Sequence, residues 1–134
     1  MDQEQQELMF KLSIFEQQIK AVQEQLQAVE QAIVEANSLK FGLEDLKQGK
    51  EKEVLAGIGK GIFIKTKITQ EDLIVDVGGK NFVKKTVKET QELIGEQIKK
   101  LEDIRKDLED RLEEINEELT KTFISAQEKG KKSK

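Results

Sequence analysis

Cysteine, histidine, tryptophan, tyrosine and proline are all absent from the 134-residue sequence. Histidine and cysteine are the usual metal ligands, nucleophiles and proton shuttles near neutral pH, so their absence removes most ordinary active sites. Carboxylates, Lys, Ser and Thr remain, but no apolar pocket that would shift their pKa values is visible in the sequence. The sequence therefore predicts a protein that is not an enzyme and uses no metal or other cofactor.

Long apolar runs are also missing, and without cysteine there is no disulfide framework. A spanning helix or a signal peptide needs a run of about 15 or more apolar residues, so we expect a cytoplasmic protein that does not enter membranes. The net charge of −4 argues against a nucleic-acid partner, because phosphate binding requires clustered lysine and arginine. The terminal KGKKSK is basic but short, and is interpreted as a solvated, disordered tail.

The residues that are present are mostly charged or aliphatic, with 37% charged and only 4% aromatic. This composition does not suit a compact globular core. It suits long helices whose apolar side chains form a narrow seam, with Glu, Lys and Gln on the other faces. The length fits a single structural unit, residues 1–134, without a separate catalytic domain.

A heptad series occupies the first third of the chain and predicts a coiled-coil helix over residues 1–49. Its members are Leu8, Leu12, Phe15, Ile19, Val22, Leu26, Val29, Ile33 and Ala36. The series continues as Leu39, Leu43 and Leu46, so one step is three residues where four was due, which predicts a stammer. Gly49 is expected to end the helix as a left-handed C-cap.

A second heptad series predicts a coiled-coil helix over residues 87–129, followed by a basic tail at 130–134. Its apolar members are Val87, Ile94, Ile98, Leu101, Leu108, Leu112, Ile115 and Leu119. Gln91 and Arg105 occupy seam positions, where polar residues penalise wrong registers. Thr86 and Glu89 form a capping-box pattern that places the helix start at Val87, and Gly130 is expected to end it.

Residues 50–86 have the alternating period of strands rather than the heptad period of helices. Candidate strands lie at 54–58, 62–68, 73–77 and 82–85, and glycine-rich links at 59–61 and 78–81 suit turns that need positive φ. Four strands therefore make two β-hairpins. We expect them to form the oligomerisation surface through Ile62, Ile64, Ile68, Val75, Val77 and Phe82.

These parts predict an α+β fold: a long antiparallel coiled-coil hairpin with two β-hairpins at its closed end. Each helix is roughly 60 Å long at about 1.5 Å per residue, and the 40-residue connection returns the chain, so both termini lie at the free tip. Two short hairpins cannot be stable alone, and their open edges invite other chains. Several subunits are therefore expected to combine their hairpins into a β-barrel body.

Two patterns that suggest binding chemistry have simpler structural explanations. The segment AGIGKG at residues 56–61 resembles a phosphate loop, but that motif has Ser or Thr after Gly-Lys and opens a helix, so a turn is favoured. The carboxylates of Glu113, Glu114, Glu117 and Glu118 could gather a divalent ion, but a solvated helical face is favoured.

Four apolar residues, Met9, Phe10, Phe123 and Ile124, fall outside the seam, and all four lie where the free tip is expected. Two interpretations remain open. In the first, they form an adhesive surface for a partner. In the second, the helix ends splay and these residues pack together as a hydrophobic plug.

The layout of helix, two β-hairpins and helix resembles the alpha class of the prefoldin family, whose beta class carries only one hairpin. The resemblance is carried by VLAGIGKGIFIKTKI at 54–68 and LIVDVGGKNFVKKTVKE at 73–89. The second segment is the more specific, since its glycine turn, Lys-Lys-Thr and capped helix look like the family's approach to the second arm. The chain departs from the family at Ala56-Gly57, where members often have Val-Pro.

The resemblance implies an ATP-independent holdase: a hexamer of two alpha and four beta prefoldin subunits that holds unfolded clients and passes them to a group II chaperonin. By position, the family's client-contacting tips correspond here to Leu8, Met9, Phe10, Leu12, Phe15, Leu119, Phe123 and Ile124. The alternative is a structural coiled-coil assembly, such as a filament-forming prefoldin relative.

Overall fold

The computed structural model describes residues 2–47, 49 and 51–132. Along the chain these form α1 (Gln3–Gly42), the 3-10 helix η1 (Leu43–Leu46), β1 (Glu53–Gly59), β2 (Ile62–Lys67), β3 (Leu73–Asp76), β4 (Phe82–Lys85) and α2 (Val87–Lys132). Two compact units result, residues 1–32 with 101–134, and residues 33–100. Two long helices with two small antiparallel β-hairpins between them in sequence confirm the predicted α+β fold.

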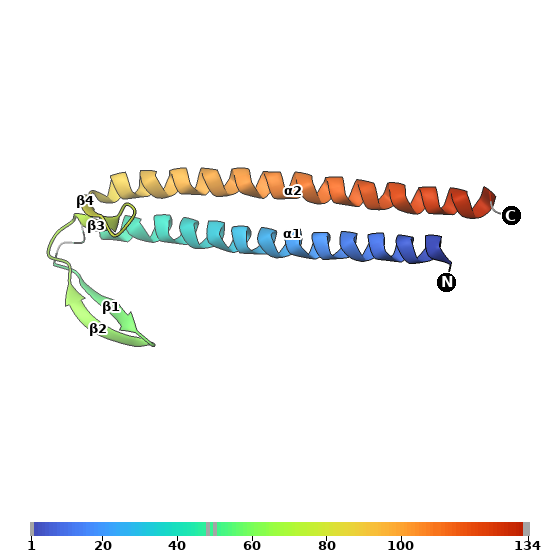
Figure 1. The fold of residues 1–134 in the computed structure, drawn as a ribbon. Helices are drawn as coiled ribbons and strands as arrows, with labels where there is room; N and C mark the ends of the chain where they lie inside the picture. Colours follow the sequence, from blue (N-terminus) through green and yellow to red (C-terminus); the bar gives the residue numbers. More distant parts are fainter. Residues whose placement is uncertain (1, 48, 50, 133–134) are drawn as a thin grey trace. The chain divides into compact units, whose positions relative to one another are not determined.

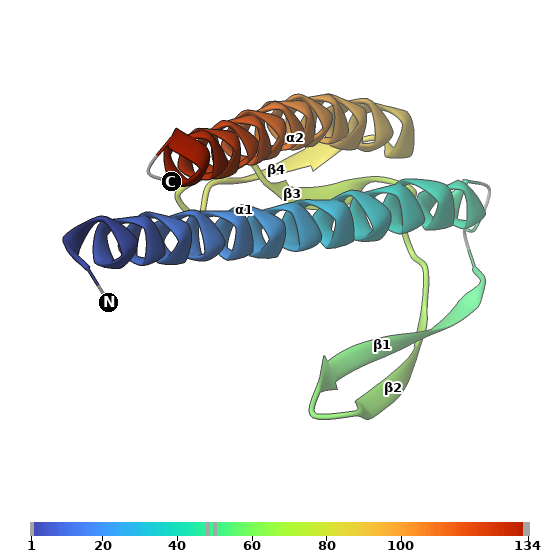
Figure 2. The ribbon, with the colours of Figure 1, turned by 90° about the vertical axis from the view of Figure 1, so that its right-hand side faces the viewer.

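In the unit made of residues 1–32 and 101–134, the two helices lie side by side and antiparallel, with both termini at one end (Figures 1 and 2). Asp2 caps α1, because its backbone oxygen accepts from the Gln6 amide at 3.1 Å and its Oδ1 accepts from the Gln5 amide at 2.8 Å. These bonds satisfy amides that have no partner within the helix and favour a start at this position.

The heptad seam is confirmed by burial. Every member of the first series from Leu8 to Ala36 is buried or half-buried, and so is every member of the second from Val87 to Leu119, polar Gln91 and Arg105 included. Val22 is the most buried, at 3% exposure, and no described side chain falls below 2%. The seam is therefore a thin apolar stripe and not a closed core, as expected for two helices in contact.

Within the unit of residues 33–100, the predicted stammer at Leu39 is wrong. Leu39 is 56% exposed, whereas Leu43, seven residues after Ala36, is buried, so the heptad continues unbroken with Lys40 at the seam position. Gly95 of α2 explains how a lysine fits there. A Cβ at Gly95 would lie 3.3 Å from the Lys40 Nζ, so the missing side chain leaves room for Lys40.

Two helix ends differ from the positions that glycine predicted. The α-helical part of α1 ends at Gly42 and continues as η1, after which the extended backbone of Lys47 ends the helical run before Gly49. At the other end of the chain, α2 continues through Gly130 to Lys132. The start of α2 is as predicted, since the Glu89 amide donates to Thr86 Oγ1 at 3.0 Å.

Gln91 joins the two helices by hydrogen bonds across the seam. Its Nε2 donates to the Lys40 carbonyl at 3.1 Å and to Glu44 Oε1 at 3.0 Å, and the Lys47 ammonium donates to the same Glu44 oxygen at 3.0 Å. Gln91 thereby satisfies a carbonyl in the last turn of α1. The hydrogen bonds from Lys47 and Gln91 lower the pKa of the Glu44 carboxyl.

We expect Gln91→Ala to lower the free energy of unfolding by about 1–2 kcal/mol, because the Lys40 carbonyl loses its side-chain donor in a partly buried position. Chemical denaturation followed by circular dichroism measures this change. The matched control is Gln97→Ala, six residues along the same helix but exposed, which should leave stability unchanged. Equal losses for the two variants would contradict a specific role for Gln91.

Glu44 should make this junction sensitive to acid. Its folded pKa is depressed below 4.5, so its contribution to stability is present above about pH 4.5 and is lost as the pH falls through the folded pKa. The difference in unfolding free energy between wild type and Glu44→Gln should therefore shrink as the pH is lowered below that value. A difference that stayed constant between neutral pH and strongly acidic pH would show that the charge of Glu44 does not matter.

The two β-hairpins form separate two-stranded sheets, β1 with β2 and β3 with β4. Gly59, Lys60 and Gly61 all have positive φ and make the first turn. The second turn is fixed by Asp76, whose Oδ1 accepts from the Gly78 amide at 2.9 Å. The AGIGKG segment accordingly ends a strand and opens another strand, which confirms the turn interpretation and removes the phosphate-loop one.

Candidate functional site

The four apolar residues outside the seam are exposed in the unit that holds both termini. Met9 is 55% exposed, Phe10 68%, Phe123 47% and Ile124 50%. The plug interpretation required these side chains to bury one another, and their exposure contradicts it. The other predicted tip residues, Leu8, Leu12, Phe15 and Leu119, are half-buried members of the seam. The tip therefore combines an apolar seam with apolar side chains that face solvent.

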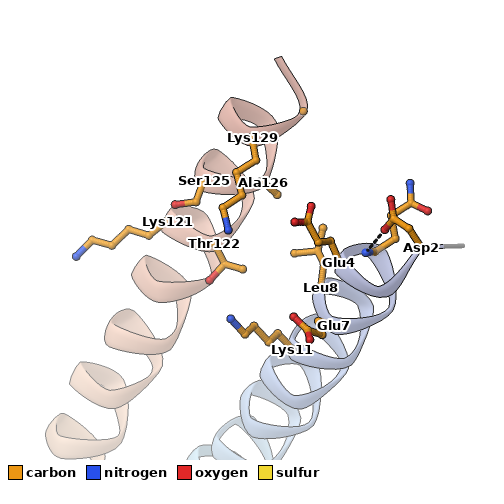
Figure 3. A pocket seen from close by; sticks show the side chains of 12 residues that line it. Asp2, Glu4, Glu7, Leu8, Lys11, Lys121, Thr122, Ser125, Ala126 and Lys129 are labelled. Atoms are coloured by element: carbon orange, nitrogen blue, oxygen red, sulfur yellow. Dashed lines mark hydrogen bonds between the residues drawn. The ribbon is translucent and has the colours of Figure 1, made fainter. Parts of the chain in front are cut away.

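The seam becomes less apolar toward this end of α2. After Leu119 the next half-buried positions are Thr122 and Ala126, so small side chains stand where leucine would close the coiled coil. The helices leave a groove of about 630 Å³ between them here, which Figure 3 shows. Leu8 and Ala126 supply apolar surface, and Glu4, Glu7, Lys11 and Lys129 are among the charged residues around it. A groove with such a mixed apolar and charged lining suits contact with a polypeptide rather than chemistry on a small molecule.

The β1–β2 hairpin is apolar on both faces. Register pairs Ala56 with Ile64 and Gly57 with Phe63, which places these two pairs on opposite faces. On one face, Ile62 and Ile64 are more than half exposed; on the other, Phe63 is 63% exposed. Apolar side chains on both faces are typical of a strand buried between layers, and among the described residues nothing buries either face to that extent.

The β3–β4 hairpin divides its apolar residues differently. Leu73 packs against the buried cluster of Leu43, Val87, Ile94 and Ile98, and Val75 is half-buried on the same face of the strand. Ile74 and Phe82 stand on the opposite face at 72% and 63% exposure. The outward face is therefore free for a partner, while the inward face contributes to the core of this unit.

The predicted strand residues consequently have unequal roles. Ile62, Ile64 and Phe82 lie on strands and are exposed, Val77 follows β3 and is 49% exposed, and Val75 and Ile68 are half-buried. Ile68 lies just beyond β2, where its amide donates to the Lys52 carbonyl and its carbonyl accepts from Glu51. Val75 and Ile68 thus stabilise the subunit itself, and Ile62, Ile64, Val77 and Phe82 remain available to a partner.

A family model described as a prefoldin subunit matches residues 15–132. The chain belongs to the prefoldin family. This match covers α2, both hairpins and α1 from Phe15 onward, so it includes Phe123 and Ile124 of the tip but not Met9 or Phe10.

Among its curated relatives, prefoldin subunit alpha of Methanobrevibacter smithii is 34% identical over 98 residues, which cover 72% of this chain and 67% of the relative. Prefoldin subunit alpha 2 of Thermococcus kodakarensis is 37% identical over 82 residues, or 60% of this chain and 58% of the relative. These relatives confirm the predicted likeness to alpha subunits. As a prefoldin, the chain is a chaperone-type subunit.

The fold also matches a solved structure. A chain in the cryo-EM structure of filamentous PFD from Methanocaldococcus jannaschii superposes with a TM-score of 0.77, covering 85% of this chain and 96% of that chain, at 22% sequence identity. This likeness shows that the two chains share a fold.

Other kinds of site have little support in the described part of the prefoldin chain. Residues 2–47, 49 and 51–132 contain no group of three or more carboxylates placed to hold a metal ion, and Glu113, Glu114, Glu117 and Glu118 are all exposed. Neither helix has, over its described length, a stretch apolar enough to cross a membrane.

Sequence reasoning missed three exposed strand residues, Leu55, Phe63 and Ile74. Leu55 and Phe63 lie on the opposite face of β1–β2 from the predicted Ile62 and Ile64. Ile74 lies on the same face of β3–β4 as the predicted Phe82. The signal was present in the sequence, because residues 54–58 and 62–64 contain almost no polar residue. A strand without polar alternates predicts burial on both faces.

Proposed function

We propose that the chain is a subunit of an ATP-independent holdase that captures unfolded polypeptides at its helical tip. The observation that carries this function is the exposure of Met9, Phe10, Phe123 and Ile124 beside the groove that Leu8 and Ala126 line. An unfolded chain exposes apolar side chains of many shapes. A shallow apolar surface on paired helix ends binds such segments through burial, without requiring one sequence.

Assembly through the hairpins completes the proposal. Four strands in two separate sheets have open edges and exposed apolar faces, which prefoldin beta subunits would cover in a hexamer of two alpha and four beta subunits. Several arms would then contact one client, and the second contact benefits from the effective concentration set by the first. Held clients would pass to a group II chaperonin in the cytoplasm.

Client protection should be independent of ATP and of metal ions. We expect added ATP and added EDTA each to leave suppression of aggregation unchanged, because the proposed holding rests on apolar burial and the described residues contain no carboxylates that converge on a metal site. The measurement is light scattering by a denatured client diluted into buffer with the assembled complex. A loss of protection on chelation would show that a metal site operates, and nucleotide-dependent release would overturn holding without hydrolysis.

A filament-forming role is the second candidate, favoured by the structural likeness to a chain from a filamentous PFD. In that role the tips or hairpins would be covered by end-to-end contacts and not by clients. Negative-stain electron microscopy of the chain alone, and of the chain mixed with a prefoldin beta subunit, distinguishes the filament-forming role from the holdase role. Filaments of the chain alone that fail to suppress client aggregation would favour the structural role over the holdase.

A further inference from the structure

The groove at the helical tip runs along both helices. Its lining residues lie between positions 2 and 11 on α1 and between positions 121 and 130 on α2, which corresponds to about 14 Å of helix. On each helix they recur at steps of three or four residues, so they form a continuous wall. A polypeptide segment that fills this groove aligns with the two helices, and a third, amphipathic helix presents side chains at the matching spacing.

The two walls of the groove carry opposite charge. The α1 wall has three carboxylates and one lysine, which sum to −2, and the α2 wall has two lysines and no carboxylate, which sum to +2. Figure 3 shows Glu4 and Lys11 extending from α1 toward α2, whereas Lys121 points away from α1 and forms the outer edge of its wall. The charged lining residues are Asp2, Glu4, Glu7 and Lys11 on α1, and Lys121 and Lys129 on α2.

The acidic wall is not neutralised within the subunit. Glu4 and Glu7 are exposed, and neither forms an ion pair with any described residue. Only Asp2 has a polar partner on its own helix, the Gln5 amide. A segment that covers Leu8 and Ala126 excludes water beside these walls, so its own charges interact with them more strongly than they would on an open surface.

From this we infer that the groove selects client segments by charge: amphipathic segments with Lys or Arg on the flank beside α1 and Asp or Glu on the flank beside α2. The inference rests on the proposed holdase function and adds a rule for its clients. Apolar burial attracts any apolar segment, and the flanking charges decide between segments. A segment with one sign of charge on both flanks is attracted by one wall and repelled by the other.

The test uses the full chain and three synthetic amphipathic peptides that share one leucine stripe. One peptide has Lys on both flanks, one has Glu on both, and one has Lys on one flank and Glu on the other. Fluorescence anisotropy of labelled peptide measures each Kd at about 0.1 M NaCl, where charges more than about 10 Å from the groove are largely screened. We expect wild type to bind the two-signed peptide at least about fivefold more tightly than either of the others.

Reversing one wall should change the preferred peptide. Glu4→Lys combined with Glu7→Lys changes the α1 wall from −2 to +2, so the all-Glu peptide should become the tightest binder. Lys121→Glu combined with Lys129→Glu changes the α2 wall from +2 to −2, so the all-Lys peptide should become the tightest binder. Circular dichroism checks the helicity of each variant. Glu4→Gln combined with Glu7→Gln brings the α1 wall to zero without reversing it, and should reduce the advantage of the two-signed peptide over the all-Glu one.

The matched control is Glu16→Lys combined with Glu24→Lys, which changes the net charge equally at exposed α1 positions outside the groove. It should keep the wild-type ranking. A ranking that neither wall reversal alters would overturn charge selection, and so would failure of all three peptides to bind. An equal gain for all three peptides on reversal would also overturn it, because the opposed walls would then act as a latch that closes the groove.

The proposed function is tested separately by the four tip residues outside the groove. If Met9, Phe10, Phe123 and Ile124 are replaced together by serine and the chain still suppresses aggregation, clients bind elsewhere and the tip fails as the holding site. If that variant loses suppression while wild type binds all three peptides equally, the holding site stands and only the charge rule fails.

Discussion

We expect that replacing Met9, Phe10, Phe123 and Ile124 together by serine will abolish suppression of client aggregation while leaving the subunit folded and assembled. Each of these side chains contributes up to roughly 1.5–3 kcal/mol when a client buries it fully. In the proposed assembly several arms would hold one client, so the loss on each arm would multiply through effective concentration. None of the four belongs to the seam, so helix pairing loses little. The measurement is light scattering of a denatured client with wild-type or mutant complex.

The control for this prediction replaces Val34 and Ile104 by serine, since both are exposed apolar residues on the same helices but outside the tip. That variant should protect clients as wild type does. Circular dichroism and native mass confirm helicity and assembly of each variant. A tip variant that is intact and still protects fully would refute the tip as the client site. A tip variant that loses helicity would mean that these side chains stabilise the helix ends.

We expect Ile64→Asp and Phe82→Asp each to prevent assembly, because each would place a carboxylate on a face that the proposed partner covers. An unpaired charge buried in an interface costs several kcal/mol, and the open hairpin edges supply little to offset it. Ile64 and Phe82 are 52% and 63% exposed in the subunit, so the folded monomer tolerates either change. Native mass spectra of the chain mixed with its partner subunit measure the loss.

Two further variants calibrate this result. Ile104→Asp introduces the same charge at an exposed apolar site on α2, and the assembly should survive it. Val75→Asp should lower the stability of the subunit itself, because Val75 is half-buried on the face that Leu73 turns to the helices. If Ile64→Asp and Phe82→Asp both assembled as wild type does, a body built from hairpins would be excluded.

The seam could be predicted from sequence because each helix has only one apolar stripe and its remaining faces are charged. Heptad spacing alone placed Val22, Ile33 and Ile115 in the interior, where they lie. Thr86 likewise identified the start of α2, since a capping box depends on residues three apart in the chain. Both features are local in sequence, which is why they were visible without a structure.

Three predictions failed or stayed incomplete, each for a different physical reason. Leu39 looked like a seam residue because it is apolar, but the absence of a side chain at Gly95 admits Lys40 instead. Gly130 was expected to end α2 as a C-cap, but a glycine is also tolerated inside a helix at modest cost, and α2 continues to Lys132. The buried and exposed faces of the hairpins could not be distinguished for a third reason. Both alternating sets of strand residues contain apolar side chains, so alternation alone did not indicate which face is buried.

The absence of any side chain below 2% exposure in the described seam has a consequence for motion. No single heptad contributes most of the contacts between the two helices, so separating one heptad loses only a small part of the free energy of unfolding. The pair should therefore fray progressively from the terminal end, where Thr122 and Ala126 replace larger residues, rather than unfold in one step. Amide hydrogen exchange should show a gradient of protection along both helices, fastest around Leu8 and Ala126. A client would then meet a surface that rearranges to its shape within the lifetime of an encounter.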